Sequence, residues 1–177
     1  EPRGSMMRKC RFMLRTCRPA SVNEIVRGTL HHLAPQFAHR KIADVTDLDA
    51  GLPPLALDAD RFALALTNLL VNAAEAMPTG GTLTVSTAAA TGGSTMFLDV
   101  CDDGTGIDPE ITGRLFDPFV STKRDGVGLG LVNVKAVVVS HGGSIAFEAN
   151  QPKGTRARIT LPMPGVVGTA GRDEADG

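Results

Sequence analysis

One segment joins a strand pattern to a glycine-containing loop: Met96-Phe97-Leu98-Asp99-Val100-Cys101-Asp102-Asp103-Gly104-Thr105-Gly106. Apolar residues recur at every second position from Met96 to Val100, which predicts a strand with one face in the core. Asp102 follows after Cys101 and is fixed by the strand end. Gly104 and Gly106 let the backbone turn sharply and approach a flat ligand. A carboxylate held there can accept a hydrogen bond from an exocyclic amine, although aspartate and glycine also serve ordinary turns.

Helix and strand patterns alternate on both sides of this segment. Helices are expected over 21–39, 59–77, 109–116 and 129–141, and strands over 42–48, 55–57, 83–87, 96–100, 145–149 and 155–161. Ser21 and Glu24 form a capping-box signature, and Asp58 can cap the second helix. Short turns at 91–94 and 150–154 predict antiparallel hairpins. The order favours an α/β fold, a two-layer sandwich in which a mixed, mainly antiparallel sheet carries helices on one face.

Composition narrows the class of protein. The chain has 177 residues, a formal net charge of -1 and 20 glycines. The near-neutral charge argues against a nucleic-acid-binding protein. Its three cysteines form no C-x-x-C pair, which argues against a disulfide scaffold or a zinc site. No apolar run reaches the roughly 18 residues that a membrane-spanning helix requires.

A polar face is expected on the helix over 59–77. Asn68, Asn72 and Glu75 have i, i+4, i+7 spacing, so they share one side of the helix, opposite its apolar stripe. A solvated helix face would explain this pattern. Asparagine is, however, a poor helix former for a face that only contacts water. Amide oxygens there can instead reach a hard cation such as Mg²⁺, which prefers oxygen ligands.

Two further clusters lie near the start of the last helix. Phe116-Asp117-Pro118-Phe119 precedes Ser121-Thr122-Lys123-Arg124. The two phenylalanines can be an ordinary anchor under a loop, and the adjacent lysine and arginine can either be solvated or contact phosphate oxygens. Gly126, Gly128 and Gly130 alternate into the helix, and amides at a helix N-terminus can cradle phosphate. The chain has no dinucleotide-binding G-x-G-x-x-G after a strand, no G-x-x-x-x-G-K-[ST] motif and no protein-kinase catalytic loop.

The order and spacing of these clusters resemble a known family. Asn68…Asn72, Asp102-x-Gly104-x-Gly106, Phe116…Phe119 and Gly126-x-Gly128-x-Gly130 resemble the N, first glycine, F and second glycine boxes of sensor histidine kinases. The resemblance covers roughly residues 21–162. The run at 68–77 and the short Ser121-Thr122-Lys123 segment look most like the nitrogen-regulation (NtrB-like) branch. The resemblance implies the Bergerat fold of the GHKL superfamily, shared with gyrase, mismatch-repair and heat-shock ATPases.

The resemblance also implies roles for individual residues. Asn72 would coordinate Mg²⁺, and Asn68 would assist at the phosphates. Asp102 would bond the adenine amino group, and Thr155 would support adenine through water. The complete set of expected ATP-binding residues is Asn68, Asn72, Glu75, Asp102, Gly104, Gly106, Ile107, Phe119, Lys123, Gly126, Gly128, Leu129, Gly130, Leu131 and Thr155.

A lid over the triphosphate is implied as well. Phe116 and Phe119 would anchor it, the alternating glycines would let it close, and Lys123 would contact phosphate. Glu75 departs from the family, which often carries lysine three residues after the metal-binding asparagine. None of the histidines precedes an acid and a proline, as family acceptor histidines do; they are His31, His32, His39 and His141.

The resemblance therefore implies a protein histidine kinase fragment that uses ATP and Mg²⁺. Its partners would be a histidine-bearing dimerisation domain and a response regulator, with neither nucleic acid nor direct membrane contact. We expect a cloning remnant and the end of an upstream helical segment over 1–20, the ATP-binding domain over 21–164 and a disordered tail over 165–177. The domain would face the cytoplasm, whether the parent is membrane-anchored or soluble. A sibling GHKL ATPase, an anti-sigma-type serine kinase and a degenerate nucleotide-binding module remain alternatives.

Overall fold

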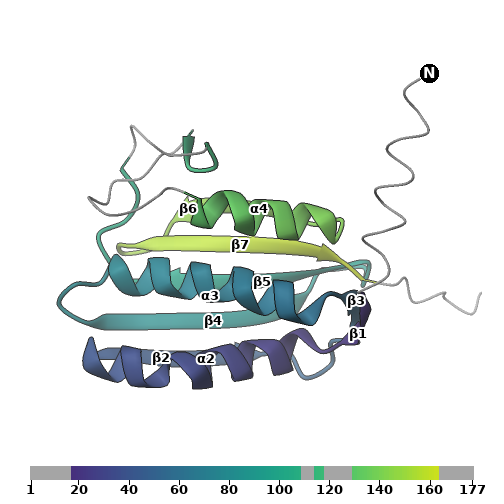
Figure 1. The fold of residues 1–177 in the computed structure, drawn as a ribbon, viewed down its shortest axis with the longest axis horizontal. Coiled ribbons are helices and arrows are strands. Elements are labelled where there is room, and N and C mark those ends of the chain that lie inside the picture. The colour runs from purple at the N-terminus through teal and green to yellow at the C-terminus, as the bar shows by residue number, and fades with distance from the viewer. Residues whose placement is uncertain (1–16, 109–113, 118–128, 164–177) are drawn as a thin grey trace, which may run out of the picture.

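The computed structural model describes residues 17–108, 114–117 and 129–163. The elements follow one another as β1 (Arg18–Ala20), α2 (Val22–His39), β2 (Ile42–Leu48), β3 (Leu55–Leu57), α3 (Ala59–Glu75), β4 (Gly81–Ala89), β5 (Thr95–Asp102), α4 (Gly130–Ser140), β6 (Ser144–Ala149) and β7 (Thr155–Pro162). Figure 1 shows their arrangement. The helix expected over 109–116 and the tail expected over 165–177 involve residues outside the described ranges and stay predictions.

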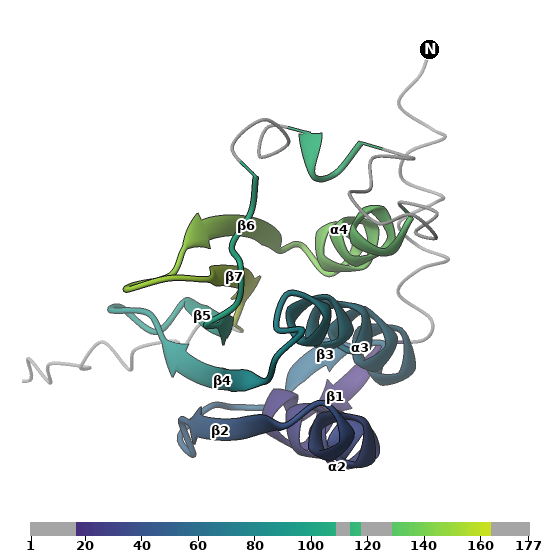
Figure 2. The same ribbon diagram turned by 90° about the vertical axis from the view of Figure 1, so that its left-hand side faces the viewer.

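The elements form two layers, as the sequence predicts. The main sheet has the strand order β2-β4-β5-β7-β6. β2 pairs with β4 in parallel, and the other neighbouring strands are antiparallel. Seen from the side, α2, α3 and α4 stack along one face of this sheet (Figure 2). The mixed, mainly antiparallel α/β sandwich is therefore confirmed.

A second, two-stranded sheet corrects one expectation. Residues 18–20 are not the end of a helix, because β1 pairs antiparallel with β3 and joins Ala20 to Leu55. Pro19 has no N–H to donate to a helix interior, and it is tolerated in a short strand. The strand pairing therefore extends the packed domain to residue 18, before the expected boundary at residue 21.

The core lies between the helices and the sheet. Phe62, Leu66 and Leu70 of α3 are at most 1% exposed, and they form the apolar stripe that their spacing predicts. Leu83 of β4 and Leu98 of β5 are completely buried on the inner face of the sheet. Each such side chain stabilises the fold by roughly 1.5–3 kcal/mol relative to exposure. The core thus holds α3 firmly against the strands that lead to the Asp102 loop.

Side chains fix the ends of the helices. Ser21 accepts a hydrogen bond from the Glu24 N–H, and Asp58 accepts one from the Arg61 N–H, so both predicted N-caps are confirmed. His141, just after α4, accepts a bond from the Asp58 N–H through Nε2 at 2.9 Å. This bond ties the end of α4 to the beginning of α3, the two helices that border the cavity described below.

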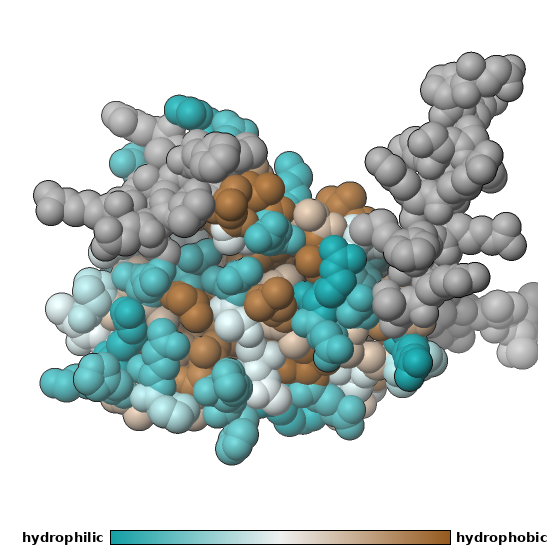
Figure 3. Space-filling model, viewed as in Figure 1, coloured by the Kyte–Doolittle hydropathy of each residue, from teal (hydrophilic) through white to brown (hydrophobic). Residues whose placement is uncertain are grey.

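The outer side of the helical layer is not uniformly polar. Apolar patches lie over α3 and α4 among hydrophilic side chains (Figure 3). Leu64 of α3 and Val139 of α4 are large apolar residues with 63% and 56% of their surface exposed. Within the parts of the chain that the structure describes, no helix has both the length and the apolar character needed to cross a membrane.

Candidate functional site

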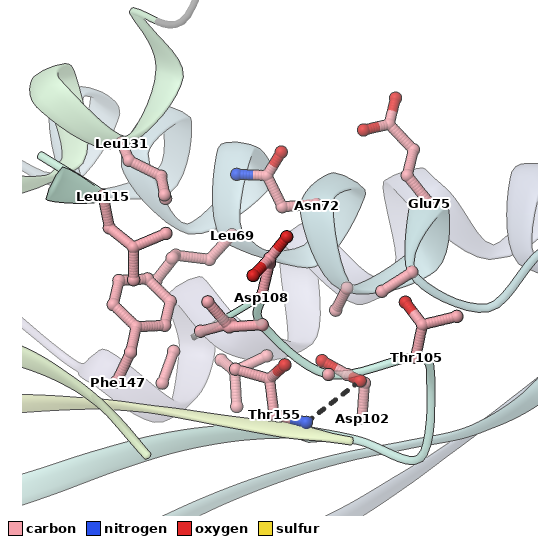
Figure 4. Close-up of a pocket in the computed structure, with 16 residues that line it drawn as sticks. Leu69, Asn72, Glu75, Asp102, Thr105, Asp108, Leu115, Leu131, Phe147 and Thr155 are labelled. Carbon is pink, nitrogen blue, oxygen red and sulfur yellow. Dashed lines mark hydrogen bonds between the residues drawn. The ribbon is translucent and has the colours of Figure 1, made fainter. Parts of the chain in front are cut away.

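A cavity of about 600 Å³ opens between α3, the loop after β5 and the beginning of β7. Its volume suits a small-molecule ligand such as a nucleotide. Figure 4 shows Asn72 and Glu75 on α3, with Asp102 and Thr155 across the cavity from them. The fold thus brings together residues from both halves of the domain.

Asp102 lies at the bottom of the cavity and is 4% exposed. Its Oδ1 accepts a hydrogen bond from the Gly104 N–H at 2.9 Å and another from the Thr155 N–H at 3.2 Å. Two main-chain donors therefore fix the direction of the carboxyl group. A carboxylate oriented in this way can accept a further hydrogen bond from a ligand amine.

Glycines allow the chain to approach Asp102 closely. A Cβ atom on Gly154 would overlap the Asp102 carbonyl oxygen, and Gly154 has a φ of +101°. A Cβ atom on Gly104 would overlap the Ala76 carbonyl oxygen at the end of α3. Gly104 thus allows its loop to pass close to the end of α3, and Gly154 allows a close approach to Asp102. The predicted approach of Gly104 to a flat ligand stays a prediction. Gly106 has a φ of +78°, which favours glycine.

Burial raises the pKa of the Asp102 carboxyl above its ordinary value. The hydrogen bonds from the Gly104 and Thr155 N–H groups act against this rise, and the nearby charge of Asp103 adds to it. The site therefore holds a carboxyl group that is less acidic than usual. An amine donor from a ligand would favour the ionised form and offset part of the burial penalty.

The α3 wall supplies amide and carboxylate oxygens. Asn72 lines the cavity together with Leu69 and Ala73, so it stands on the cavity-facing row and not opposite the apolar stripe. Glu75 also lines the cavity, and its carboxylate points away from Asp102 (Figure 4). Among the described residues, no three His, Cys, Asp or Glu side chains cluster as a metal site. The Asn72 amide oxygen is of the kind that a hard cation binds together with oxygen atoms of a bound molecule or water.

One end of the cavity is apolar. Leu115, Leu131 and Phe147 gather there (Figure 4). Phe116 packs on Phe147 with ring centroids 5.6 Å apart, and the Lys135 ammonium lies 4.7 Å from the centre of the Phe116 ring. Phe116 is thus anchored between β6 and α4, a position that fits its predicted role as a lid anchor.

The predicted site residues divide into three groups. Those that line the cavity are Asn72, Glu75, Asp102, Gly106, Ile107, Leu131 and Thr155. Described residues that do not line it are Asn68, Gly104, Leu129 and Gly130, of which Gly104 contacts Asp102 through its N–H. Phe119, Lys123, Gly126 and Gly128 lie outside the described residues, as does Arg124. Their expected roles stay predictions.

Several lining residues were not among the expected ATP-binding residues, although Leu69, Ala73, Ala76 and Thr105 lie within the motif segments. The lining residues outside the expected set are Leu69, Ala73, Ala76, Val100, Thr105, Asp108, Leu115, Phe147 and Ala157. The helical spacing of Leu69, Ala73 and Ala76 would have predicted a shared face with Asn72. For Phe147 and Ala157 the sequence carries only a strand pattern. Their place in the cavity follows from the pairing of β6 and β7, which brings them to one edge of the sheet.

Comparisons with known proteins agree with this geometry. The model of the histidine kinase-, DNA gyrase B-, and HSP90-like ATPase family matches residues 57–165. The sensory histidine kinase/phosphatase NtrB of Azospirillum brasilense is 38% identical over 137 residues, which cover 70% of this chain and 34% of that protein. The sensor protein TdiS of Thauera aromatica is 30% identical over 149 residues, which cover 82% of this chain and 27% of that protein.

A solved structure of a sensor histidine kinase is also similar to this chain. The mycobacterial sensor histidine kinase MprB matches with a TM-score of 0.72 and 29% identity, covering 82% of this chain and 97% of that one. The chain spans between about a quarter and a third of the length of these two curated relatives. The matched relatives include two sensory histidine kinases/phosphatases named NtrB, the branch that the run at 68–77 resembles.

Proposed function

This chain belongs to the family of histidine kinase-, DNA gyrase B-, and HSP90-like ATPases, and we propose that it binds Mg·ATP and donates the γ-phosphoryl group to a histidine. In this proposal it is the catalytic domain of a two-component sensor histidine kinase. The acceptor lies on a dimerisation domain, since none of the four histidines here is followed by an acid and a proline. The observation that carries the proposal is the buried Asp102 carboxyl, fixed by two main-chain donors at the bottom of the cavity.

Asp102 has the chemistry to select adenine. Its Oδ1 is occupied by the Gly104 and Thr155 N–H groups, which leaves further acceptor capacity for the exocyclic amine of the base. A guanine would present a carbonyl oxygen at the same ring position and would meet a carboxylate without a proton between them. Thr155, at the beginning of β7, supports the base through its side chain and an ordered water.

The α3 wall suits the phosphates and a hard cation. Mg²⁺ prefers oxygen ligands and is commonly held by one or two protein oxygens together with substrate phosphates and water. The Asn72 amide fits this donor set, because it lines the cavity beside the space above Asp102. Bound Mg²⁺ supplies positive charge that neutralises the phosphate oxygens.

The beginning of α4 suits the triphosphate. Within the described residues no side chain caps the first turn of this helix at Leu129. N–H groups at such an end favour an anion. Phosphoryl transfer requires positioning and charge neutralisation more than covalent help from the protein. We infer that this domain positions ATP with Asp102 and Asn72, and that Lys123 contacts phosphate from the lid.

The domain operates in the cytoplasm with a dimerisation domain and a cognate response regulator as partners. Its ATP-binding unit spans 21–164 together with the strand β1.

A transfer assay tests the proposed function. The chain is incubated with γ-labelled ATP and Mg²⁺, alone and with the dimerisation domain of the related NtrB kinase. We expect no stable label on the chain alone and an acid-labile phosphohistidine on the added domain. Acid-stable label would indicate a serine kinase. ATP binding without transfer to any acceptor would indicate a nucleotide-binding module.

A further inference from the structure

The turn between β6 and β7 contacts the main chain of Asp102, whose carboxyl group faces the cavity. The pairing of β5 with β7 ends at Cys101 and Arg156, so Asp102 lies one residue beyond the last pair of that ladder. At this point the Asn150 Nδ2 donates a hydrogen bond to the Asp102 carbonyl oxygen at 2.8 Å. A side chain from the turn thus continues the hydrogen bonding of the sheet at the residue whose carboxyl group faces the cavity.

Asn150 is itself held on two sides. Its Oδ1 accepts a hydrogen bond from the Gln151 N–H at 3.0 Å, and its own N–H donates to the Gly154 carbonyl at 3.0 Å. These bonds fix which end of the amide faces Asp102, because only the NH₂ group can donate to a carbonyl oxygen. The side chain is therefore an oriented donor aimed at the Asp102 main chain.

The same turn contacts Asp102 at two further points. Gly154 comes so close to the Asp102 carbonyl that a Cβ atom would overlap it. The Thr155 N–H donates to the Asp102 carboxyl. Asn150 thus fixes the main chain of Asp102 while Thr155 fixes its side chain. A hydrogen bond to a ligand weakens steeply with poor distance and angle, so the position of this main chain decides how well the carboxylate meets a base.

We propose that Asn150 is a positioning residue for adenine recognition. It holds the Asp102 main chain so that the carboxylate meets the exocyclic amine of the base. The inference rests on the proposed ATP binding and extends it to a residue outside the four motif segments. Asn150 acts through Asp102 and does not touch the nucleotide.

The test compares two nucleotides that differ only in the amine. ATP and purine riboside triphosphate, which carries hydrogen in place of the 6-amino group, are titrated calorimetrically into the unchanged chain and into Asn150→Ala. The unchanged chain should prefer ATP by about tenfold or more, the worth of a charge-assisted hydrogen bond. Asn150→Ala should reduce this preference by roughly three- to tenfold, mainly by weakening ATP binding.

Gln151→Ala is the matched control, because Gln151 is exposed in the same turn and its main-chain N–H is unchanged by the substitution. It should keep the full preference for ATP. A merely structural role of Asn150 would weaken both nucleotides equally and leave the preference intact in Asn150→Ala. That result would overturn the inference.

A second variant guards against misfolding. Asn150→Asp keeps the shape and the acceptor for the Gln151 N–H, but it sets an oxygen against the Asp102 carbonyl. It should lose more of the preference than Asn150→Ala, with melting curves confirming that each variant is folded. If the unchanged chain binds neither nucleotide, the proposed function fails and this inference fails with it. If it prefers ATP and both variants keep that preference, the inference alone fails.

Discussion

The two sides of the cavity are held in place by different means. The floor is made of Asp102 and Thr155, which line the cavity, together with Gly104 and Gly154, which contact Asp102; it is fixed by main-chain hydrogen bonds and by glycines that allow close contact. The rim is made of side chains that project from α3, α4 and β6, and its members are Asn72, Glu75, Leu131 and Phe147. The position of the rim therefore depends on how whole elements pack.

This difference separates two tasks. A floor that the main chain fixes is formed before any ligand arrives, and preorganised donors and acceptors cost little to use on binding. It suits recognition of a rigid, flat base. A rim of side chains suits a flexible, charged group such as a triphosphate. Substitutions in the floor should therefore affect the fold and the base preference, and substitutions in the rim should affect the phosphate and the cation.

The largest effect is expected in the floor at Gly154. In Gly154→Ala the added Cβ meets the Asp102 carbonyl at a φ of +101°, so the strain of that backbone conformation and a main-chain overlap act together. We expect a loss of about 3 kcal/mol or more in the free energy of unfolding. Denaturant titration followed by circular dichroism measures it.

Gly92→Ala is its matched control. Gly92 has a φ of +98°, and nothing lies within 4 Å of an added Cβ. The free energy of unfolding of this variant should fall by only roughly 1–2 kcal/mol, the cost of the backbone strain alone. Equal losses in the two variants would show that the contact with Asp102 contributes nothing and would break the contrast between floor and rim.

Asp102→Asn should come next in size. The amide oxygen can still accept from Gly104 and Thr155, but an NH₂ group replaces the oxygen that meets the base. ATP binding should weaken by about 1–3 kcal/mol while the melting temperature stays close to that of the unchanged chain. Calorimetric titration with ATP measures the loss. Unchanged affinity would contradict the assignment of Asp102 to the base.

The raised pKa of Asp102 predicts a pH dependence with opposite signs for binding and stability. The folded chain binds this proton more tightly than the unfolded chain, so stability falls as pH rises from the ordinary aspartate range through the raised pKa. ATP affinity changes in the opposite direction, because the ionised form accepts the amine bond. It falls as pH drops through the same range.

Comparison with Asp102→Asn isolates the contribution of Asp102 to the pH dependence of ATP affinity. The variant lacks the titrating group, while the titration of ATP itself is common to both proteins. The ATP affinities of the unchanged chain and of Asp102→Asn should therefore become more similar as the pH falls. Profiles that stay parallel would show that the Asp102 charge takes no part in binding.

A substitution in the rim should act through the cation. Asn72→Ala removes the amide oxygen that we assign to Mg²⁺, so ATP affinity in the presence of Mg²⁺ should fall by roughly 1 kcal/mol or more. The ATP affinity measured without Mg²⁺, in the presence of a chelator, should change little. An equal loss with and without Mg²⁺ would place Asn72 at the nucleotide and not at the ion.

The smallest effect is expected at the edge of the rim. Lys135→Ala removes the ammonium above the Phe116 ring, and a cation–π contact at an exposed site contributes about 0.5–1 kcal/mol. The free energy of unfolding should fall by no more than this amount, with the preference for adenine unchanged. A lost base preference would mean that rim and floor are coupled.

The sequence predicts the local parts of this molecule well. The caps at Ser21 and Asp58, the two hairpins and the apolar stripe of α3 all follow from short-range patterns. The family resemblance assigns Asn72, Asp102 and Thr155 to one ATP site, and the fold brings them to one cavity. Short-range signals suffice here because each motif sits at the end or on the face of a strongly patterned element.

What the sequence could not predict depends on contacts between distant segments. β1 is a three-residue strand that exists through its pairing with β3, so nothing in 18–20 alone indicates it. Asn150 reads as an ordinary turn residue, and its bond to the Asp102 carbonyl spans 48 positions in the chain. Phe147 reaches the cavity only because β6 pairs with β7 beside it.

Calorimetric titration of the chain with ATP and with GTP, both with Mg²⁺, shows whether Asp102 selects adenine. If Asp102 selects the 6-amino group of adenine, ATP should bind at one site per chain, and GTP, which has a carbonyl oxygen at that position, should bind at least about tenfold more weakly. Equal binding of the two nucleotides, or no binding of ATP, would contradict the account.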